Sequence, residues 1–375
     1  MDAIKYLLVL LPLLAGCQIN YLASSGYNQM KLLNARVPID EALKDPKITD
    51  QEKRKLELAQ KARAFAENDL HLKPTKNYTS YVKLDRPYVT YVVSAAYKWE
   101  LKHYQWSYPF LGKMPYKGYF NEADAKTQEQ ELQTEDLDTY MRGVSAYSTL
   151  GWFNDPLLSS MLRYKDYDLV NTIIHETVHA TLYIKGNADF NESLAMFLGN
   201  KGAEQYYLKT EGDNSPTLAQ IKKDNEDDKI FSKFISEELK DLASWYKDLP
   251  PAEHIEEKRM ARIQAIQEKF KKEILPTMHT KNYEKFTSAK LNNARLLVYK
   301  TYMQDLADFE TLYQQSGKNM QIFIEKCKAL EGEKDPAKKL KDLIGTKSES
   351  ELNANIPSAE IQQDQKKKET QIPTH

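Results

Sequence analysis

The chain has 375 residues but only two cysteines, so it can hold neither a disulfide framework nor a cysteine-rich zinc module. It also lacks an excess of charge, because 53 Lys and Arg residues balance 54 Asp and Glu residues. Proteins that bind nucleic acid usually present a basic face to the phosphates, so this balance argues against nucleic acid as a partner. A metal site in this chain must therefore be built from carboxylates and from the seven histidines.

Long hydrophobic runs are also missing, since the apolar run near the N-terminus covers only residues 6–16. A helix needs about 20 apolar residues to cross a bilayer. Lys5 before this short run is typical of a secretory signal. The end of the run, Leu14-Ala15-Gly16-Cys17, resembles the bacterial lipobox, in which the cysteine is diacylated and becomes the new N-terminus. An ordinary secretion signal and a cytosolic N-terminal helix are the alternatives.

The lipobox resemblance implies that residues 1–16 are a signal peptide and that Cys17 is the lipidation site, leaving 375 − 16 = 359 residues in the mature chain. Several acyl chains on one residue anchor a protein stably. We therefore expect a lipid anchor in the bacterial cell envelope. By resemblance to diderm lipoproteins, Gln18 favours the periplasmic face of the outer membrane. Cys327 has no cysteine partner in its helical segment and is interpreted as a structural thiol.

Local patterns predict a mixed, mostly helical chain. The capping-box spacing at Thr49 and Glu52 begins a predicted helix over 50–69. Further predicted elements are two strands within 77–97, an aromatic loop-and-strand region at 104–120 that lines a groove or packs beneath a sheet, a helix over 121–135, a strand over 143–153, and long helices over 227–248, 251–273 and 286–315. Residues 346–375 have few apolar side chains and are predicted to be a disordered polar tail.

The segment His175-Glu176-Thr177-Val178-His179 contains the pattern H-E-x-x-H. The composition of the chain makes roughly 0.02 chance matches expected, so the pattern is informative. Histidines at i and i+4 lie on one face of a helix and can bind one Zn²⁺ ion. Glu176 lies beside such an ion, where a carboxylate can accept a proton from the attacking water. The alternative is a structural helix whose histidines are satisfied by hydrogen bonds.

A catalytic zinc site needs a third protein ligand and keeps one position open. Gly186 is expected to end the first helix, residues 187–189 to form a turn, and Asn191 and Glu192 to open a second helix. An antiparallel helix pair would bring Glu192 back to the two histidines across the 12 intervening residues. Glu192 is therefore the predicted third ligand, and Asp189 is the alternative.

The element Asn191-Glu192-x-x-Ala195 resembles the N-E-x-x-A element of gluzincin aminopeptidases, although its spacing from H-E-x-x-H is shorter than theirs. Together with the lipobox, the stretches GVSAYSTLGWFNDPLLSSML, HETVHATLY, FNESLA and LNNARLLVYKTY resemble a bacterial family of zinc aminopeptidases, up to about residue 330. The resemblance implies an α+β fold in which a small sheet packs on the H-E-x-x-H helix. It also implies one zinc ion, a metallopeptidase domain over 17–225, and a helical C-terminal part of the same fold over 226–345.

In gluzincins, the edge strand ahead of the zinc helix pairs with the extended substrate through backbone hydrogen bonds. The resemblance assigns this role to Gly143, Ala146, Tyr147 and Gly151, whose segment is otherwise an interior structural strand. Aminopeptidases of this type hold the free amine of the substrate with acidic residues. The stretch 143–153 contains no Asp or Glu, which leaves exopeptidase specificity open.

The sequence therefore predicts zinc-assisted hydrolysis of peptide bonds, with Glu176 as the general base. The oxyanion of the tetrahedral intermediate needs a further donor, and the candidates are Tyr299, Tyr302, Arg295 and Tyr147. Three functions remain open: an aminopeptidase, an endopeptidase acting on envelope proteins, and a non-catalytic zinc-stabilised lipoprotein that binds other proteins. The substrate in the first two cases is a peptide or protein, and the sequence carries no signal for an oligomeric state.

Overall fold

The computed structural model describes residues 20–108, 112–146, 149, 153–253, 255–302 and 306–345. The predicted signal peptide, Cys17, Tyr147, Gly151 and the tail over 346–375 lie outside these residues. The fold is α+β and mostly helical, as predicted. The chain forms two compact units that divide between Leu306 and Ala307.

The first unit begins with a helix over residues 20–34, followed by β1 (Val37–Pro38), α2 (Ile39–Ala42) and α3 (Asp50–Asn68). The capping box at the start of α3 is confirmed. Thr49 Oγ1 accepts a hydrogen bond from the Glu52 backbone N–H at 3.2 Å, and Glu52 Oε2 accepts one from the Thr49 backbone N–H at 2.8 Å. These bonds satisfy two of the amides that a helix N-terminus leaves without partners.

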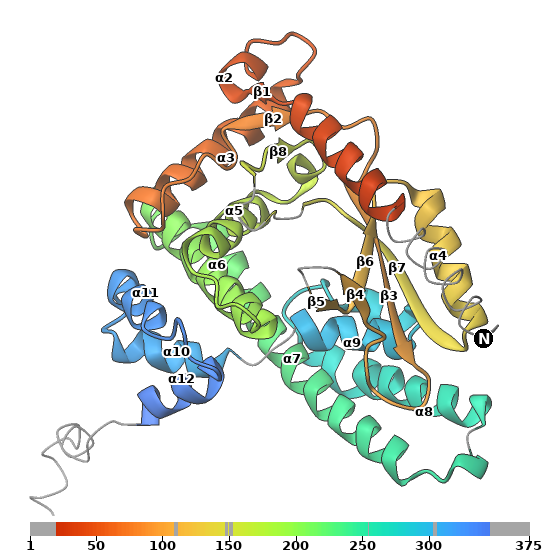
Figure 1. The fold of residues 1–375 in the computed structure, drawn as a ribbon. Helices are drawn as coiled ribbons and strands as arrows, with labels where there is room; N and C mark the ends of the chain where they lie inside the picture. The colour runs from red at the N-terminus through yellow and green to blue at the C-terminus, as the bar shows by residue number, and fades with distance from the viewer. Residues whose placement is uncertain are drawn as a thin grey trace, which may run out of the picture. The chain divides into compact units, whose positions relative to one another are not determined.

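The strands of the first unit form three small sheets (Figure 1). The first orders its strands β1, β2 (Ser80–Val82) and β8 (Leu157–Leu158). The second is antiparallel, with β3 (Thr90–Tyr97) in the middle and β6 (Tyr116–Tyr119) and β7 (Leu137–Val144) at its edges. The third pairs β4 (Trp106–Tyr108) with β5 (Gly112–Met114), so the aromatic region at 104–120 contributes strands to two sheets.

Helices cover both faces of the β6-β3-β7 sheet. On one face, α4 (Glu122–Thr134) packs through Ala125 and Leu132 against Val93 and Ala95. On the other face, α9 (Asn293–Tyr302) packs against β3 and β7. The main neighbours of the H-E-x-x-H helix are α3 and α6, so the expected packing of the small sheet on that helix is wrong.

A buried ion pair joins β7 to α8 (Glu256–Lys269) and to the start of α9. Arg259 is 1% exposed, and its two guanidinium nitrogens donate to the carboxylate of Asp138 at 2.6 and 3.0 Å. The same carboxylate accepts from the backbone N–H of Asn293 at 2.8 Å. Because a buried charge without a partner is costly, this pair fixes where β7, α8 and α9 meet.

The predicted strand over 143–153 is wrong in its bounds, because β7 ends at Val144. Beyond the strand, buried Asp155 accepts hydrogen bonds from the Thr149 backbone N–H at 2.9 Å and from Thr149 Oγ1 at 2.8 Å. These bonds use Thr149 groups within the stretch that we predicted to be a strand. Gly143 remains in β7, whereas Ala146 lies beyond its end.

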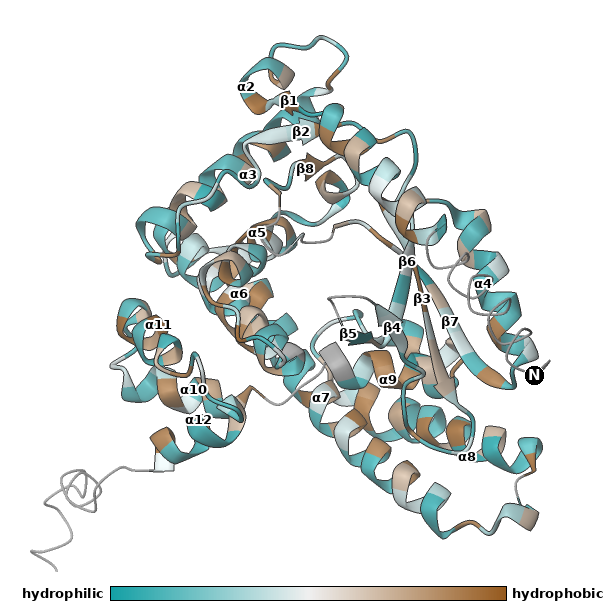
Figure 2. Ribbon diagram, in the orientation of Figure 1, coloured by the Kyte–Doolittle hydropathy of each residue, from teal (hydrophilic) through white to brown (hydrophobic). Residues whose placement is uncertain are grey.

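Helices make up the rest of the first unit. The remaining elements are α5 (Asp166–Thr181), α6 (Ala188–Glu211), α7 (Pro216–Asp248), α8 (Glu256–Lys269), a π-helical segment (Phe270–Ile274), and 3-10 turns at Met161–Arg163, Pro251–Glu253, Leu275–Thr277 and Glu284–Ser288. Hydrophobic side chains of α7, α8 and the segments up to α9 form one core around Phe231, Ile263 and Phe270. In Figure 2 the ribbons of these helices alternate between brown hydrophobic and teal hydrophilic positions. Residue 225, where we expected the helical part to begin, lies inside α7.

The predicted helix over 286–315 is also wrong, because two separate helices occupy this range. Asn292 Oδ1 accepts from the Arg295 backbone N–H at 3.0 Å, and Asp138 accepts from that of Asn293, so α9 starts here with its first amides satisfied. The second unit begins with α10 (Ala307–Gln315) and continues with α11 (Met320–Lys328) and α12 (Pro336–Gly345). Cys327 is fully buried in it, and burial raises the pKa of its thiol, as expected of a structural cysteine.

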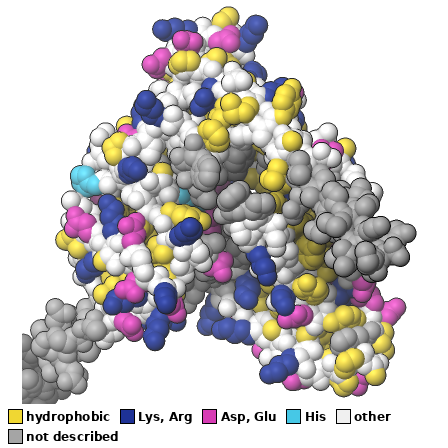
Figure 3. Space-filling model, in the orientation of Figure 1, with side chains coloured by type: hydrophobic (Ala, Val, Ile, Leu, Met, Phe, Trp, Pro, Cys, Tyr) yellow, Lys and Arg dark blue, Asp and Glu magenta, His cyan; other side chains and the backbone are white. Residues whose placement is uncertain are grey.

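On the face shown in Figure 3, basic and acidic side chains are interspersed, in keeping with the balanced composition. Within the described ranges, every helix is too short or too polar to cross a membrane.

Candidate metal centre

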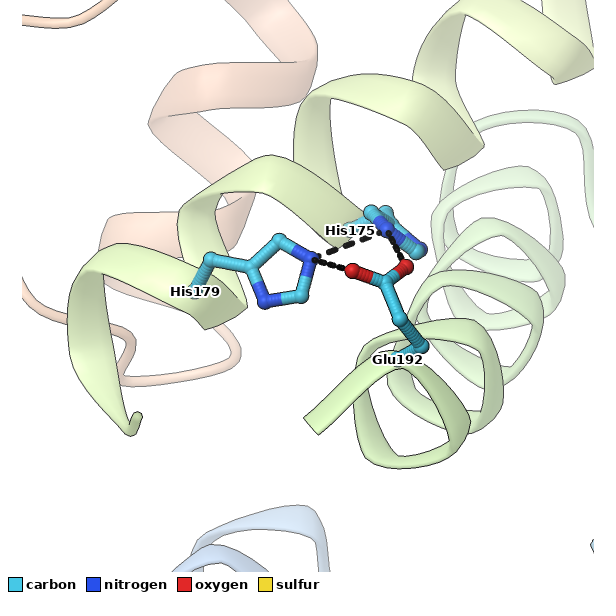
Figure 4. A group of neighbouring side chains, drawn as sticks. All are labelled: His175, His179 and Glu192. Atoms are coloured by element: carbon cyan, nitrogen blue, oxygen red, sulfur yellow. Dashed lines mark hydrogen bonds and ion pairs between the residues drawn. The ribbon is translucent and has the colours of Figure 1, made fainter. Parts of the chain in front are cut away.

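Three side chains from two helices converge at one point (Figure 4). His175 and His179 project from the same face of α5, and Glu192 reaches toward them from α6. The Nε2 atoms of the histidines lie 3.1 Å apart. Glu192 Oε2 lies 3.6 Å from His175 Nε2, and Glu192 Oε1 lies 3.5 Å from His179 Nε2. In the described part of the chain, this is the group of His, Cys, Asp and Glu side chains that could hold a metal ion.

The spacing of these atoms fits a zinc ion. Zinc–ligand bonds of about 2.05 Å in a tetrahedral arrangement place neighbouring ligand atoms ~3.3 Å apart. The three observed separations, 3.1, 3.5 and 3.6 Å, bracket this value. Two imidazoles and one carboxylate are also the donor set of many catalytic zinc sites, in which a fourth position takes water or substrate.

The loop between α5 and α6 determines the position of Glu192. Gly186 has a φ of 82°, a left-handed conformation that favours glycine, and lets the chain reverse direction. Asn191, which is 1% exposed, then ties the loop to α6. Its Oδ1 accepts from the Ile184 backbone N–H at 2.9 Å, and its Nδ2 donates to the Ile184 carbonyl at 2.8 Å. Helix α6 starts at Ala188, so the prediction that it opens at Asn191 was three residues late.

Two glycines allow α5 and α6 to approach closely. A Cβ atom on Gly199 would lie 2.7 Å from Asn171 Oδ1 and 3.3 Å from the Asn171 carbonyl oxygen. A Cβ atom on Gly202 would lie 2.9 Å from side-chain atoms of Ile174 and Leu70. Since real Cβ contacts are longer, larger residues would push the helices apart and separate Glu192 from the histidines.

Burial and mutual charge determine the protonation of the group. Burial lowers the pKa of His179 to about 4, and the charge on His175 adds to this effect. Burial also acts on Glu192, but the hydrogen bond from His175 and the charges on both histidines lower its pKa overall. Burial opposes the charged form of His175, yet hydrogen bonds to Glu192 and to the Ala195 backbone and the charge on Glu176 raise its pKa overall. A neutral His179 and an ionised Glu192 are the forms that bind metals.

Glu176 lies next to His175 in the chain and near the buried Tyr78 and the half-buried Tyr164. Burial, followed by the charge on Glu176, raises the pKa of Tyr78. Burial raises the pKa of Tyr164, and the charge on Glu176 contributes to the same shift. Tyr78 has a φ of 58°, which is unusual for a large side chain. Such strained residues are often found near functional sites.

The segment after β7 reaches the surroundings of Glu176. Ser160 Oγ donates to the carbonyl of Ser145 at 2.5 Å. The Ser145 side chain is also hydrogen-bonded to Tyr164, whose phenol senses the charge on Glu176. The C-terminal end of the edge strand β7 is thereby tied to the segment that leads into the metal-binding helix.

The other predicted site residues lie in different surroundings. The ring of Tyr299 packs 5.5 Å from those of Phe231 and Phe286 in the helical core. The guanidinium of Arg295 lies 5.0 Å from the centre of the Tyr140 ring on β7, and its buried Nε has no hydrogen-bond partner among the described residues. The Tyr302 side chain lies outside the described structure. Asp189, the alternative ligand, is exposed and is not part of the converging group.

Gly143, the substrate-strand residue inside β7, is shielded on one side. A Cβ atom here would lie 2.2 Å from the ring of Tyr88, so only glycine allows that ring to pack on the strand. Sequence reasoning missed Tyr78, Tyr164 and the loop-fixing role of Asn191. The only local signal for Asn191 was its place in the N-E-x-x-A element, because its partner Ile184 is seven residues away and on another segment.

The fold and the site together define an α+β protein with a group of three residues from two helices that could hold a metal ion. The sequence profile of a family described as "Putative aminopeptidase" matches residues 20–343. The chain therefore belongs to this family, and the family suggests a peptidase. No curated protein and no solved structure matches the chain.

Proposed function

We propose that the protein is a zinc-dependent peptidase, in the first place an aminopeptidase, anchored to the bacterial envelope through Cys17. The observation that carries the proposal is the convergence of His175, His179 and Glu192 with Glu176 one residue from the first histidine. A purely structural zinc site has no use for a carboxylate in that place. Membership in the aminopeptidase family supports the choice of reaction.

His175, His179 and Glu192 would hold the ion, which when bound supplies a Lewis acid that polarises the scissile carbonyl group and lowers the pKa of water. Glu176 accepts the proton of the attacking water and later donates a proton to the leaving amine. The neighbouring Tyr78 is buried and Tyr164 is half-buried, and the pKa values of both are raised by burial and by the charge on Glu176, so both remain neutral hydroxyls beside the base.

The substrate is expected to bind along β7, which is an edge of its sheet in the described structure. An edge strand presents free backbone donors and acceptors that can pair with an extended peptide. The link from Ser145 to Tyr164 directs the end of this strand toward Glu176. Of the candidate donors to the oxyanion, we favour Arg295, because its Nε is available and it stacks on Tyr140 of the same strand.

A peptide panel tests the proposal and separates it from its main rival. The full-length protein is incubated with peptides of one sequence that carry either a free or an acetylated N-terminus, and the products are identified by mass spectrometry. Release of single residues from the free peptide alone supports an aminopeptidase. Cleavage inside both peptides assigns an endopeptidase instead, which the absence of Asp and Glu from 143–153 would explain. No cleavage by the zinc-loaded protein assigns a non-catalytic binding module.

A further inference from the structure

The helix over residues 20–34 has an exposed apolar side. Leu22, Tyr27 and Met30 are 42%, 70% and 49% exposed, and Ala23 and Gly26 lie between them on the outward surface. In Figure 1 this helix is the red one, next to the N-terminal end of the described chain. Exposed apolar residues grouped on one helix usually mark a contact surface.

The opposite side of the same helix is fixed to the protein. The hydroxyl of Tyr21 donates to the Gly118 carbonyl at 2.9 Å, and the Tyr21 ring lies 5.5 Å from that of Tyr119 on β6. Leu32, which lies on the same side of the helix as Tyr21, is buried. The helix is therefore held in place by one side, and the apolar residues on its other side cannot turn inward.

We propose that the exposed side of this helix lies on the membrane surface, with Leu22, Tyr27 and Met30 in contact with lipid. The inference rests on the anchor at Cys17 in the proposed function. Two residues, Gln18 and Ile19, separate Cys17 from Asn20, and an extended chain spans at most about 3.5 Å for each of the three steps. The start of the helix must then stay within ~10 Å of the lipidated cysteine, which is held at the membrane.

The charge of this region suits an anionic lipid surface. From Gln18 to Ile39 the chain contains no Asp or Glu, whereas Lys31 and Arg36 are basic. Basic residues next to an anchored segment are attracted to anionic headgroups. An apolar strip flanked by basic residues is typical of helices that lie in the plane of the interface, with their apolar side about 5–10 Å deep.

The alternative occupant is a second copy of the chain, which the size of the surface disfavours. A stable dimer usually buries about 800 Å² on each partner. One helix of 15 residues is only ~22 Å long and offers three large apolar side chains, far less than that area requires.

The test uses the acylated full-length protein with a fluorescent NBD label on a single introduced cysteine, in vesicles of phosphatidylethanolamine and phosphatidylglycerol. Cys327 is fully buried and the sulfur of an acylated Cys17 is blocked, so the label reports the introduced site. Met30→Cys probes the apolar side. Asn28→Cys is the matched control, because Asn28 is half-exposed on the same helix but lies about 160° around it from Met30.

We expect the label at position 30 to emit at shorter wavelength and to be quenched by spin-labelled lipid, while the label at position 28 is not quenched by the lipid. Water-like emission from both labels, or equal quenching of both, would overturn the proposal. A shift that appears in detergent and depends on protein concentration would assign the surface to a second copy. Mass spectrometry of the same samples shows whether acyl chains are attached to Cys17. If they are absent, the anchor in the proposed function is refuted. The labelled proteins can then be mixed with vesicles, and the same two labels still test whether the helix binds lipid.

Discussion

The side chain of Asn191 hydrogen-bonds both polar backbone groups of Ile184, at 2.9 and 2.8 Å. Asn191 directly precedes Glu192, and Ile184 lies in the loop that follows the helix of His175 and His179. This one amide therefore links the two helices that carry the candidate ligands. The Ile184 carbonyl also accepts from the Asn187 backbone N–H at 3.2 Å, so loss of the Asn191 amide would leave the buried Ile184 N–H without its partner.

Replacing Asn191 with Ala is expected to weaken zinc binding without removing a ligand. Residues that orient metal ligands typically contribute about 10–100-fold to metal affinity, and we expect a loss in that range. The measurement is competition for zinc with a fluorescent chelator. Asn187→Ala is the matched control, because Asn187 precedes α6 and its side chain makes one long bond of 3.3 Å, to the Lys185 carbonyl, within the described structure. Equal affinities of the two variants would contradict the role of Asn191.

The buried pair of Arg259 and Asp138 predicts a large loss of stability. Arg259→Met leaves the buried carboxylate of Asp138 without its ion pair, which we expect to cost about 3–5 kcal/mol in the free energy of unfolding. Lys258→Met, one residue earlier, removes an exposed pair with Glu253 and should cost less than about 1 kcal/mol. Urea denaturation followed by circular dichroism compares the two, and similar losses would refute the importance of the buried pair.

Asp228 on α7 predicts a pH dependence of stability. Burial raises its pKa to about 6, and the charges on Asp224, Asp227 and Asp168 add to the shift. An unfolded aspartate titrates near 3.9, so between about pH 4 and 6 the folded protein binds more protons than the unfolded chain. This group therefore lowers the free energy of unfolding as the pH rises through that window, and the penalty persists above it.

Asp228→Asn should remove this penalty. Asn keeps an oxygen that can accept the 2.6 Å hydrogen bond from the Tyr283 hydroxyl. The variant is expected to be more stable than the native protein by about 1–3 kcal/mol at pH 7.5, with little difference at pH 4. Asp241→Asn on the same helix, at an exposed position, controls for the change of net charge. A gain in stability that is equal at both pH values would contradict the account.

The two candidates on α9 predict different outcomes. If Arg295 donates to the oxyanion, Arg295→Gln should lower kcat about 10²–10³-fold, the usual effect of losing such a donor. Tyr299→Phe should leave kcat unchanged, because the Tyr299 ring packs against Phe231 and Phe286 in the core. Steady-state kinetics with one peptide substrate distinguishes them. Full activity of Arg295→Gln, or a loss confined to Tyr299→Phe, would reverse the assignment.

The metal-binding group could be predicted because its information is local. His175 and His179 follow the helical period, and an antiparallel return of the chain is enough to bring Glu192 to them. The helix over 50–69 was predicted for a similar reason, since Thr49 and Glu52 cap it within four residues. In each case the interacting residues are near one another in the sequence or are placed by one turn.

The errors arose where distant contacts decide the structure. Strand β7 ends at Val144, and Thr149 in the stretch predicted as strand is hydrogen-bonded to Asp155 instead. Helix α9 begins at Asn293 because Asp138, far away in the sequence, accepts its backbone N–H. Tyr78 and Tyr164 come near Glu176 only through tertiary packing. The periodic pattern of apolar residues contains no information on such pairs.

The most direct test of the central claim compares the native protein with Glu176→Gln and His179→Ala. Each purified protein is analysed for bound zinc and for hydrolysis of a peptide with a free N-terminus, and His279→Gln, a change at an exposed histidine, is the control. We predict one zinc ion per chain in the native protein, in the control and in Glu176→Gln, with kcat about 10²–10⁴-fold lower only in Glu176→Gln. His179→Ala should lose both zinc and activity. A Glu176→Gln protein that binds zinc and cleaves the peptide at the native rate would contradict the account.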